Sequence, residues 1–200
     1  MKKYLIALIL SGVSLLGFGQ DIQFGLKAGA TLGYFDNEGK EYDYGDPKLG
    51  FTLGGIGRFK VSDDFFIKSE LGFSQITTGL ESSEYYIRVN RIDLMLLAGY
   101  RVSEKFDIEI GPEVNYLISA PYKSRLSSGN FDFEKNINLG ISVGSNFRIN
   151  DHFGINARYS IGLIYYDNFQ LIDENQNAAG VVKTDRVSYL SLGVNYYFKN

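Results

Sequence analysis

The feature that most constrains this chain of 200 residues is an alternation of apolar and polar side chains that recurs eight times. A period of two is typical of a β-strand with one apolar and one polar face. Between 106 and 118, for example, Ile108 and Ile110 alternate with Asp107 and Glu109. The pattern predicts an all-β chain with strands at 22–34, 48–60, 65–77, 88–101, 106–118, 136–149, 153–164 and 187–198.

The connections between these strands alternate strictly in length. Short links are expected at 61–64, 102–105 and 150–152, and long ones at about 36–47, 79–87, 119–135 and 165–186. Such alternation, with strands this long, is typical of outer-membrane barrels with short periplasmic turns and long external loops. We therefore predict an eight-stranded antiparallel up-and-down transmembrane β-barrel in contact with outer-membrane lipid, with both termini in the periplasm.

A soluble, lipocalin-like barrel is the main alternative, because its strands alternate in the same way with the apolar face inward. It provides no reason for turn lengths to alternate so strictly. The loops therefore favour the membrane barrel.

Aromatic side chains bracket each short link on the apolar face. Outer-membrane barrels carry girdles of aromatic residues at both membrane interfaces. The expected periplasmic girdle consists of Phe59, Phe65, Tyr100, Phe106, Phe147 and Phe153, with Phe24, Tyr196 and Phe198 closing it. Phe198 also suits the aromatic end signal that the barrel-assembly machinery reads, which makes that machinery an expected partner during biogenesis.

The polar face would fill the lumen of such a barrel, and it is rich in glycine and charge. Its cations are Lys27, Arg58, Lys68, Arg91, Arg148 and Arg158, and its anions are Glu70, Asp93, Asp107, Glu109 and Glu113. An eight-stranded barrel is just wide enough for side chains to fill. We expect a plug of salt bridges and hydrogen bonds, in preference to a narrow ion path or proton relay.

The N-terminus resembles a signal peptide. Lys2 and Lys3 precede an apolar run of about a dozen residues, which is short for a membrane span. Gly17 and Gly19 are the small residues expected before a cleavage site. We predict a signal peptide at 1–19 and a barrel domain at 20–200, exported to the outer membrane.

The composition excludes several chemistries. The chain has no Cys and one His, so thiolate zinc sites, multi-His metal sites and Cys nucleophiles are excluded. The single His152 lies in a short turn, where it is expected to be solvated and to lack a pocket for catalysis. The net charge of −3 gives no basic excess for nucleic acid. We predict no enzyme activity, cofactor or nucleic-acid partner.

The long loops carry the remaining candidates for binding. The first loop holds Asp36, Glu38, Glu41, Asp43 and Asp46, but their spacing does not match an EF-hand, so a solvated loop is expected and no metal site is predicted. The first loop also holds Tyr42 and Tyr44, and the third holds Pro121, Tyr122, Lys123 and Arg125. Aromatic residues mixed with charge suit contact with an extracellular protein or glycan, and also plain anchoring at the interface.

Three segments, GLKAGATLGYF at 25–35, EIGPEVNYLIS at 109–119 and above all NARYSIGL at 156–163, carry a family resemblance. The chain resembles small outer-membrane β-barrel proteins with a PorT-like barrel domain, the "porin family proteins" of Gram-negative bacteria. The resemblance covers about 22–198 and implies fold and location. One member type of that family assists an outer-membrane secretion machine. We expect a non-enzymatic outer-membrane protein, structural or partner-binding through its external loops, with a narrow channel or a secretion accessory protein as alternatives.

Overall fold

The computed structural model describes residues 22–37, 46–79, 86–123, 128–130, 136–163, 169–172, 178–182 and 184–198. The predicted signal peptide lies outside the described residues. Within these ranges, no helix is long and apolar enough to cross a membrane.

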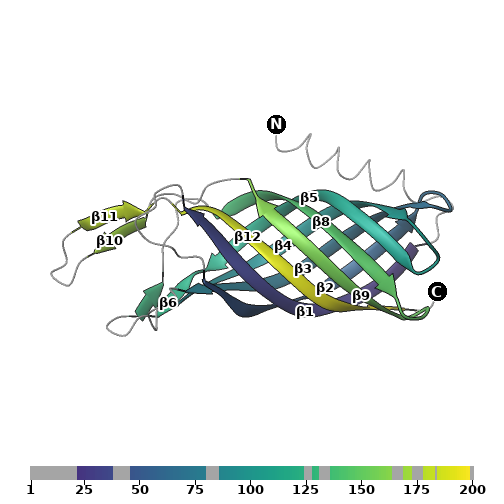
Figure 1. The fold of residues 1–200 in the computed structure, drawn as a ribbon, viewed down its shortest axis with the longest axis horizontal. Coiled ribbons are helices and arrows are strands. Elements are labelled where there is room, and N and C mark those ends of the chain that lie inside the picture. Colours follow the sequence, from purple (N-terminus) through teal and green to yellow (C-terminus); the bar gives the residue numbers. More distant parts are fainter. Residues whose placement is uncertain are drawn as a thin grey trace, which may run out of the picture.

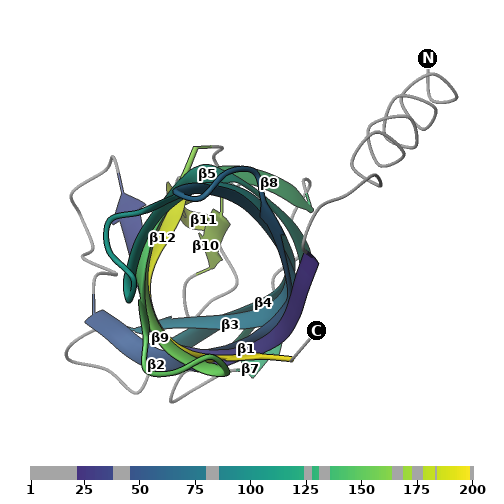
Figure 2. The same ribbon diagram turned by 90° about the vertical axis from the view of Figure 1, so that its right-hand side faces the viewer.

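Eight long strands close into an antiparallel barrel, which Figure 1 shows from the side and Figure 2 nearly end-on. They are β1 (Ile22–Asn37), β2 (Asp46–Lys60), β3 (Phe65–Gly79), β4 (Tyr86–Arg101), β5 (Phe106–Ser119), β8 (Ile137–Arg148), β9 (Phe153–Gly162) and β12 (Thr184–Tyr197). The order around the ring is β3-β2-β1-β12-β9-β8-β5-β4, and the pairing of β3 with β4 closes it. All eight predicted strands are confirmed, with bounds that shift by up to three residues.

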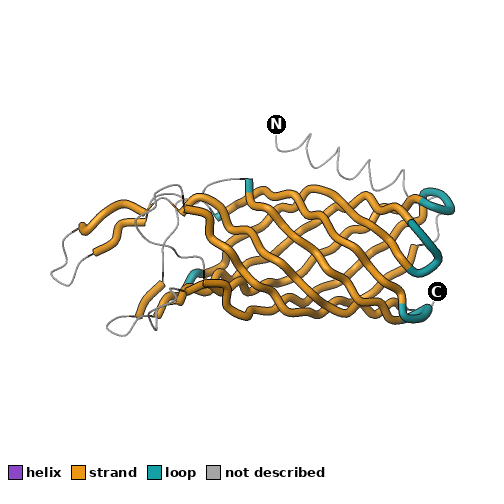
Figure 3. The backbone as a smooth tube through the Cα atoms, viewed as in Figure 1, coloured by secondary structure: helices purple, strands orange, loops and turns teal. Residues whose placement is uncertain are grey.

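The prediction is wrong where it left the two longest connections without strands. The first contains β6 (Pro121–Lys123) and β7 (Ser128–Asn130), and the second contains β10 (Phe169–Ile172) and β11 (Ala178–Val182). β6 pairs with both β4 and β7, and β10 pairs with β11. Such short strands carry too few residues for an alternation to be recognised. In Figures 1 and 3 they project beyond one end of the barrel.

The short turns lie together at the other end of the barrel. They share one hydrogen-bond pattern, in which the first turn residue donates its backbone N–H to the carbonyl that opens the next strand. The bonds are Val61 to Phe65 at 2.9 Å, Val102 to Phe106 at 2.9 Å, and Ile149 to Phe153 at 2.8 Å. The third turn therefore begins one residue before the predicted link. We call this end of the barrel the turn end and the opposite end the loop end.

The barrel carries its apolar side chains outside and its polar ones inside. Leu71 and Leu192 are both 60% exposed on the outer surface, whereas Lys68 and Asp107 are fully buried in the lumen. Soluble monomers expose only small apolar patches, because contact between apolar surface and water is unfavourable. An outer surface this apolar therefore fits contact with lipid. The soluble-barrel alternative needs the opposite arrangement and is excluded.

Candidate functional site

The centre of the lumen holds five charged side chains from four strands. Arg158 of β9 donates to both carboxylate oxygens of Glu70 on β3, at 2.7 Å each, and to Glu109 on β5 at 3.1 Å. Lys27 lies 2.6 Å from Glu70, and Lys68 lies 2.5 Å from Glu109 and 3.0 Å from Glu70. We call these residues the central cluster. Its ion pairs connect side chains from different sides of the barrel wall.

A second cluster lies towards the loop end. Arg91 contacts Asp93 at 2.9 Å and Glu113 at 3.0 Å. Glu113 also accepts hydrogen bonds from Asn115 at 2.7 Å and from the hydroxyl of Tyr189 at 3.1 Å. Because these side chains are buried, their partners replace the hydrogen bonds to water that burial removes.

A third cluster lies towards the turn end and carries an excess of positive charge. Asp107 pairs with Arg58 at 3.0 Å and with Arg148 at 3.2 Å, so one carboxylate serves two guanidinium groups. The Arg58 guanidinium lies 3.6 Å from the centre of the Phe66 ring, a cation–π contact. Gly99 makes room for that ring, because a Cβ there would lie 2.0 Å from Phe66 Cζ.

The structure thus brings together the predicted lumen charges in three clusters. Each of the six cations lies within ion-pair distance of a carboxylate in the described part of the chain. The sequence analysis listed these residues but did not assign partners to them.

Sequence reasoning missed an apolar cluster in the lumen. It consists of Ile76, Ile87, Val89, Met95, Leu97, Leu117, Val187 and Tyr189, and all are at most 5% exposed. Ile76, Ile87 and Val187 lie close to the loop ends of their strands. The signal was present in the sequence, since each of these residues occupies an inward position of the alternation. The apolar residues replace polar ones there, and in β4 they extend from the loop end past the middle of the strand, to Met95 and Leu97.

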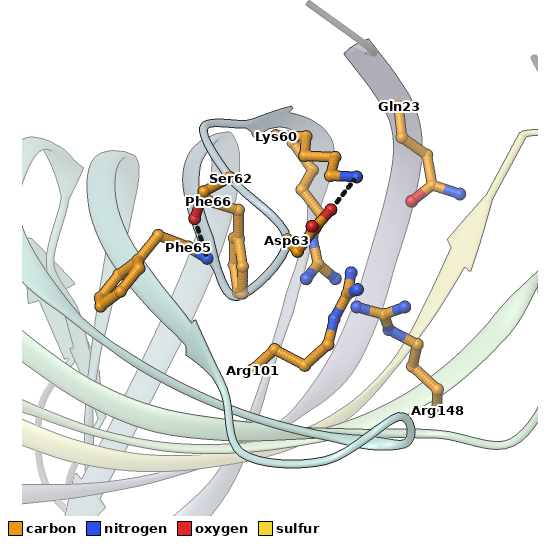
Figure 4. A pocket seen from close by; sticks show the side chains of 9 residues that line it. Gln23, Lys60, Ser62, Asp63, Phe65, Phe66, Arg101 and Arg148 are labelled. Atoms are coloured by element: carbon orange, nitrogen blue, oxygen red, sulfur yellow. Dashed lines mark hydrogen bonds and ion pairs between the residues drawn. The ribbon is translucent and has the colours of Figure 1, made fainter.

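Two cavities accompany the clusters. A cavity of about 10 Å³ lies beside Lys27, Glu70 and Asp93, with room for about one water molecule. A pocket of about 370 Å³ opens at the turn end and is shown in Figure 4. Its lining residues are Gln23, Arg58, Lys60, Ser62, Asp63, Phe65, Phe66, Arg101 and Arg148.

The six aromatic residues of the predicted periplasmic girdle all lie beside the turns. Phe65, Tyr100, Phe147 and Phe153 are exposed to between 41% and 56%, and Phe59 and Phe106 are half-buried. Phe65 packs on Tyr100 with ring centres 5.0 Å apart, and Phe153 packs on Tyr196 at 5.1 Å. Their role at a membrane interface stays a prediction.

His152 differs from the expected solvated side chain. It is half-buried, its ring stacks on Tyr196 with centres 5.9 Å apart, and its Nδ1 lies 3.1 Å from the carbonyl oxygen of Tyr197. These contacts tie the third turn to β12. Among the described side chains, no group of three or more His, Asp or Glu could hold a metal ion.

Several loop candidates lie outside the described side chains, namely Asp36, Glu38, Glu41, Tyr42, Asp43, Tyr44 and Arg125. Asp46 lies 3.5 Å from Lys48 in a half-exposed pair. Pro121, Tyr122 and Lys123 form β6, whose Lys123 is exposed.

Residues 18–168, well over half of the chain, match the family described as outer membrane protein beta-barrel domain. The chain belongs to this family. It is an outer-membrane β-barrel protein, and the short turns of such barrels face the periplasm. The PorT-like subtype stays a prediction from the resemblance.

Solved structures of small outer-membrane barrels share the fold. Ail, the attachment invasion locus protein of Yersinia pestis, is 18% identical with a TM-score of 0.53, over 88% of this chain and 98% of that one. Neisserial surface protein A is 15% identical with a TM-score of 0.54, over 88% of this chain and 97% of that one. At these identities the likeness concerns the fold alone. A search of curated proteins finds no match to this chain.

Proposed function

We propose that this outer-membrane protein is a non-enzymatic barrel that conducts no ions and presents its loop end to an extracellular partner. The observation that carries the proposal is the filled lumen, which holds three ion-pair clusters and an apolar cluster that contacts the central and second clusters through Met95 and Tyr189.

The filled lumen argues against the narrow-channel alternative for two reasons. An ion crossing the barrel would have to separate buried partners such as Arg158 and Glu70, and breaking a buried ion pair is costly. It would also meet the apolar cluster, whose polar atoms among the described side chains are the Tyr189 hydroxyl and the Met95 sulfur, both already bonded to charged lumen residues.

The loop end supports the second half of the proposal. β6 extends the sheet at the start of β4, where Tyr86 pairs with Lys123 and Ile87 pairs with Tyr122. The exposed Arg88 lies with its guanidinium carbon 4.7 Å from the centre of the Tyr86 ring. Strand pairing places Lys123 on the same face as Tyr86 and Arg88, whereas Tyr122 shares the face of Ile87 and packs against the apolar cluster of the lumen. The exposed face is therefore basic and aromatic, a composition that suits a protein or an anionic glycan.

Conductance across a planar lipid bilayer tests the closed lumen. We expect the purified, refolded barrel to give no steady single-channel steps. Regular steps that persist after repurification, and that change when Glu70 is replaced by Gln, would favour the channel alternative.

A sulfated sugar is a suitable probe for the loop end, because Ail has been crystallised in complex with the heparin analogue sucrose octasulfate. We expect sucrose octasulfate to bind this barrel and the double variant Arg88→Ala, Lys123→Ala to bind more weakly. Lys105→Ala, which removes an exposed cation at the turn end, is the matched control. Equal loss in both variants would count against a glycan site at the loop end.

The secretion-accessory alternative comes only from the family resemblance, in which one member type assists a secretion machine. Deleting the gene and measuring the export of surface proteins tests it directly, and blocked export would favour that role.

A further inference from the structure

The pocket at the turn end has a strongly basic lining that the closed-lumen function does not use. Arg58, Lys60, Arg101 and Arg148 all line it. The carboxylates near them are Asp63 in the lining and Asp107 beneath it, which pairs with Arg58 and Arg148. Among the described lining residues and their buried ion-pair partner Asp107, positive charges therefore exceed negative ones by two.

Two of these guanidinium groups have hydrogen-bonding capacity left over. Arg58 is only 6% exposed, and its Nη1 donates to Asp107, but its buried Nη2 lacks a hydrogen-bond partner among the described residues. The buried Nε of Arg101 likewise lacks a partner there. A buried donor without an acceptor is costly, so an acceptor in the pocket, either a water or a ligand oxygen, would stabilise these atoms.

The arrangement of the side chains agrees with this conclusion. In Figure 4 the guanidinium groups of Arg101 and Arg148 point toward one another, and the figure shows Asp63 bonded to Lys60 instead of standing between them. Lys60 Nζ lies 2.8 Å from Asp63, and this neighbouring ammonium holds the pKa of the Asp63 carboxyl below its ordinary value. Asp63 is therefore paired with Lys60 at the edge of the pocket, from where its charge offsets that of Arg101 only in part.

We propose that this pocket binds the phosphate group of a periplasmic ligand. Guanidinium forks match the oxygens of phosphate. The two negative charges of a phosphate monoester would balance the excess of positive charge, and the single charge of a phosphodiester headgroup would offset half of it. The volume of about 370 Å³ exceeds that of one phosphate and falls in the range of small-molecule sites. The phosphate could come from a soluble organic phosphate or from a lipid headgroup of the inner leaflet, which share the same recognition chemistry.

The test measures phosphate binding at the arginine side chains themselves. The barrel is refolded in a phosphate-free maltoside detergent and titrated with inorganic phosphate, while nuclear magnetic resonance records the Nε–H signals of Arg58, Arg101 and Arg148. We expect saturable shifts in these signals. Shifts that grow linearly without saturation would overturn the proposal.

Three variants make the test specific. Arg101→Gln removes a cation that lies in no ion pair among the described residues, and should weaken binding about tenfold, the effect of one lost charge-assisted hydrogen bond. Asp63→Asn removes the competing carboxylate and should tighten binding. Lys105→Gln makes the same change of charge at an exposed turn position outside the pocket and should leave binding unchanged. Equal weakening by Lys105→Gln and Arg101→Gln would overturn the proposal.

A second arm separates the two sources of phosphate. The same signals are recorded without added phosphate in nanodiscs of phosphatidylglycerol. Shifts in nanodiscs would identify the lipid headgroup, and shifts with soluble phosphate alone would identify a soluble ligand. Unshifted signals in both arms would overturn the proposal.

Discussion

Arg158 and Glu70 lie on opposite sides of the barrel and form a two-pronged ion pair through its centre. Their strands, β9 and β3, are separated by three strands in either direction around the ring. Both bonds measure 2.7 Å, although the residues are 88 positions apart in the chain. The pair therefore braces the barrel across its diameter, which the strand-to-strand hydrogen bonds cannot do.

Replacing Arg158 with Ala should lower the stability of the barrel. Glu70 would keep Lys27 and Lys68 as partners, so the loss should be about 1–3 kcal/mol, the cost of leaving part of a buried polar network unsatisfied. The free energy of unfolding in detergent or lipid measures this change. Arg88→Ala, at an exposed position, is the control, and an equal effect of both variants would show that Arg158 is not a brace.

Replacing Gly99 with Ala should also destabilise the barrel. The added methyl group would overlap the Phe66 ring, on which Arg58 stacks, and overpacking costs about 1–3 kcal/mol. Gly55→Ala in β2 is the matched control, because its Cβ would meet no heavy atom closer than 4.0 Å. Thermal unfolding of the two variants side by side gives the comparison. A Gly99→Ala barrel as stable as Gly55→Ala would show that Phe66 moves aside freely.

Replacing Leu192 with Arg should impair insertion into lipid. Leu192 is 60% exposed and lies midway along the barrel wall, where an arginine in an outer-membrane barrel costs about 2–4 kcal/mol. Val102→Arg, in a turn, should cost only about 0–1 kcal/mol. Equilibrium folding into vesicles at increasing denaturant measures both, and tolerance of arginine at Leu192 would contradict a lipid-facing surface there.

The closed ring should resist detergent without heating. We expect the outer-membrane fraction to give a faster gel band before boiling than after it, because the intact barrel is more compact than the unfolded chain. A single band, unchanged by boiling, would mean that the ring opens in detergent.

The strands could be predicted from the sequence because each long strand repeats one simple signal. A residue such as Leu192 faces lipid and its neighbour Ser191 faces the lumen, so the period of two is visible without knowledge of the partners. The short strands β6 and β10 could not be predicted, because three or four residues contain too little alternation.

The partners in the lumen could not be predicted for a different reason. The alternation along each strand shows that Arg158 and Glu70 both point inward. Whether the two side chains reach the same height in the lumen depends on the stagger of the strands around the ring. That stagger is the sum of the registers of all the strand pairs between β3 and β9, and no short segment of the sequence records it. The turn-end pocket is hidden in the same way, because Arg58, Arg101 and Arg148 come from three different strands.

The pairing of β1 with β12 joins the two ends of the chain, from Gly25 opposite Tyr197 to Asn37 opposite Thr184. A ribosome releases β12 last, so a chain that lacks it has two open strand edges, and open edges invite pairing with other chains. Every earlier stage of synthesis and export therefore handles a molecule prone to aggregate. The same seam places Phe198 beside Phe24, with a backbone hydrogen bond of 2.8 Å between them. This proximity makes the barrel a natural candidate for circular permutation, in which β1 and β12 are joined there and new ends are opened in a loop.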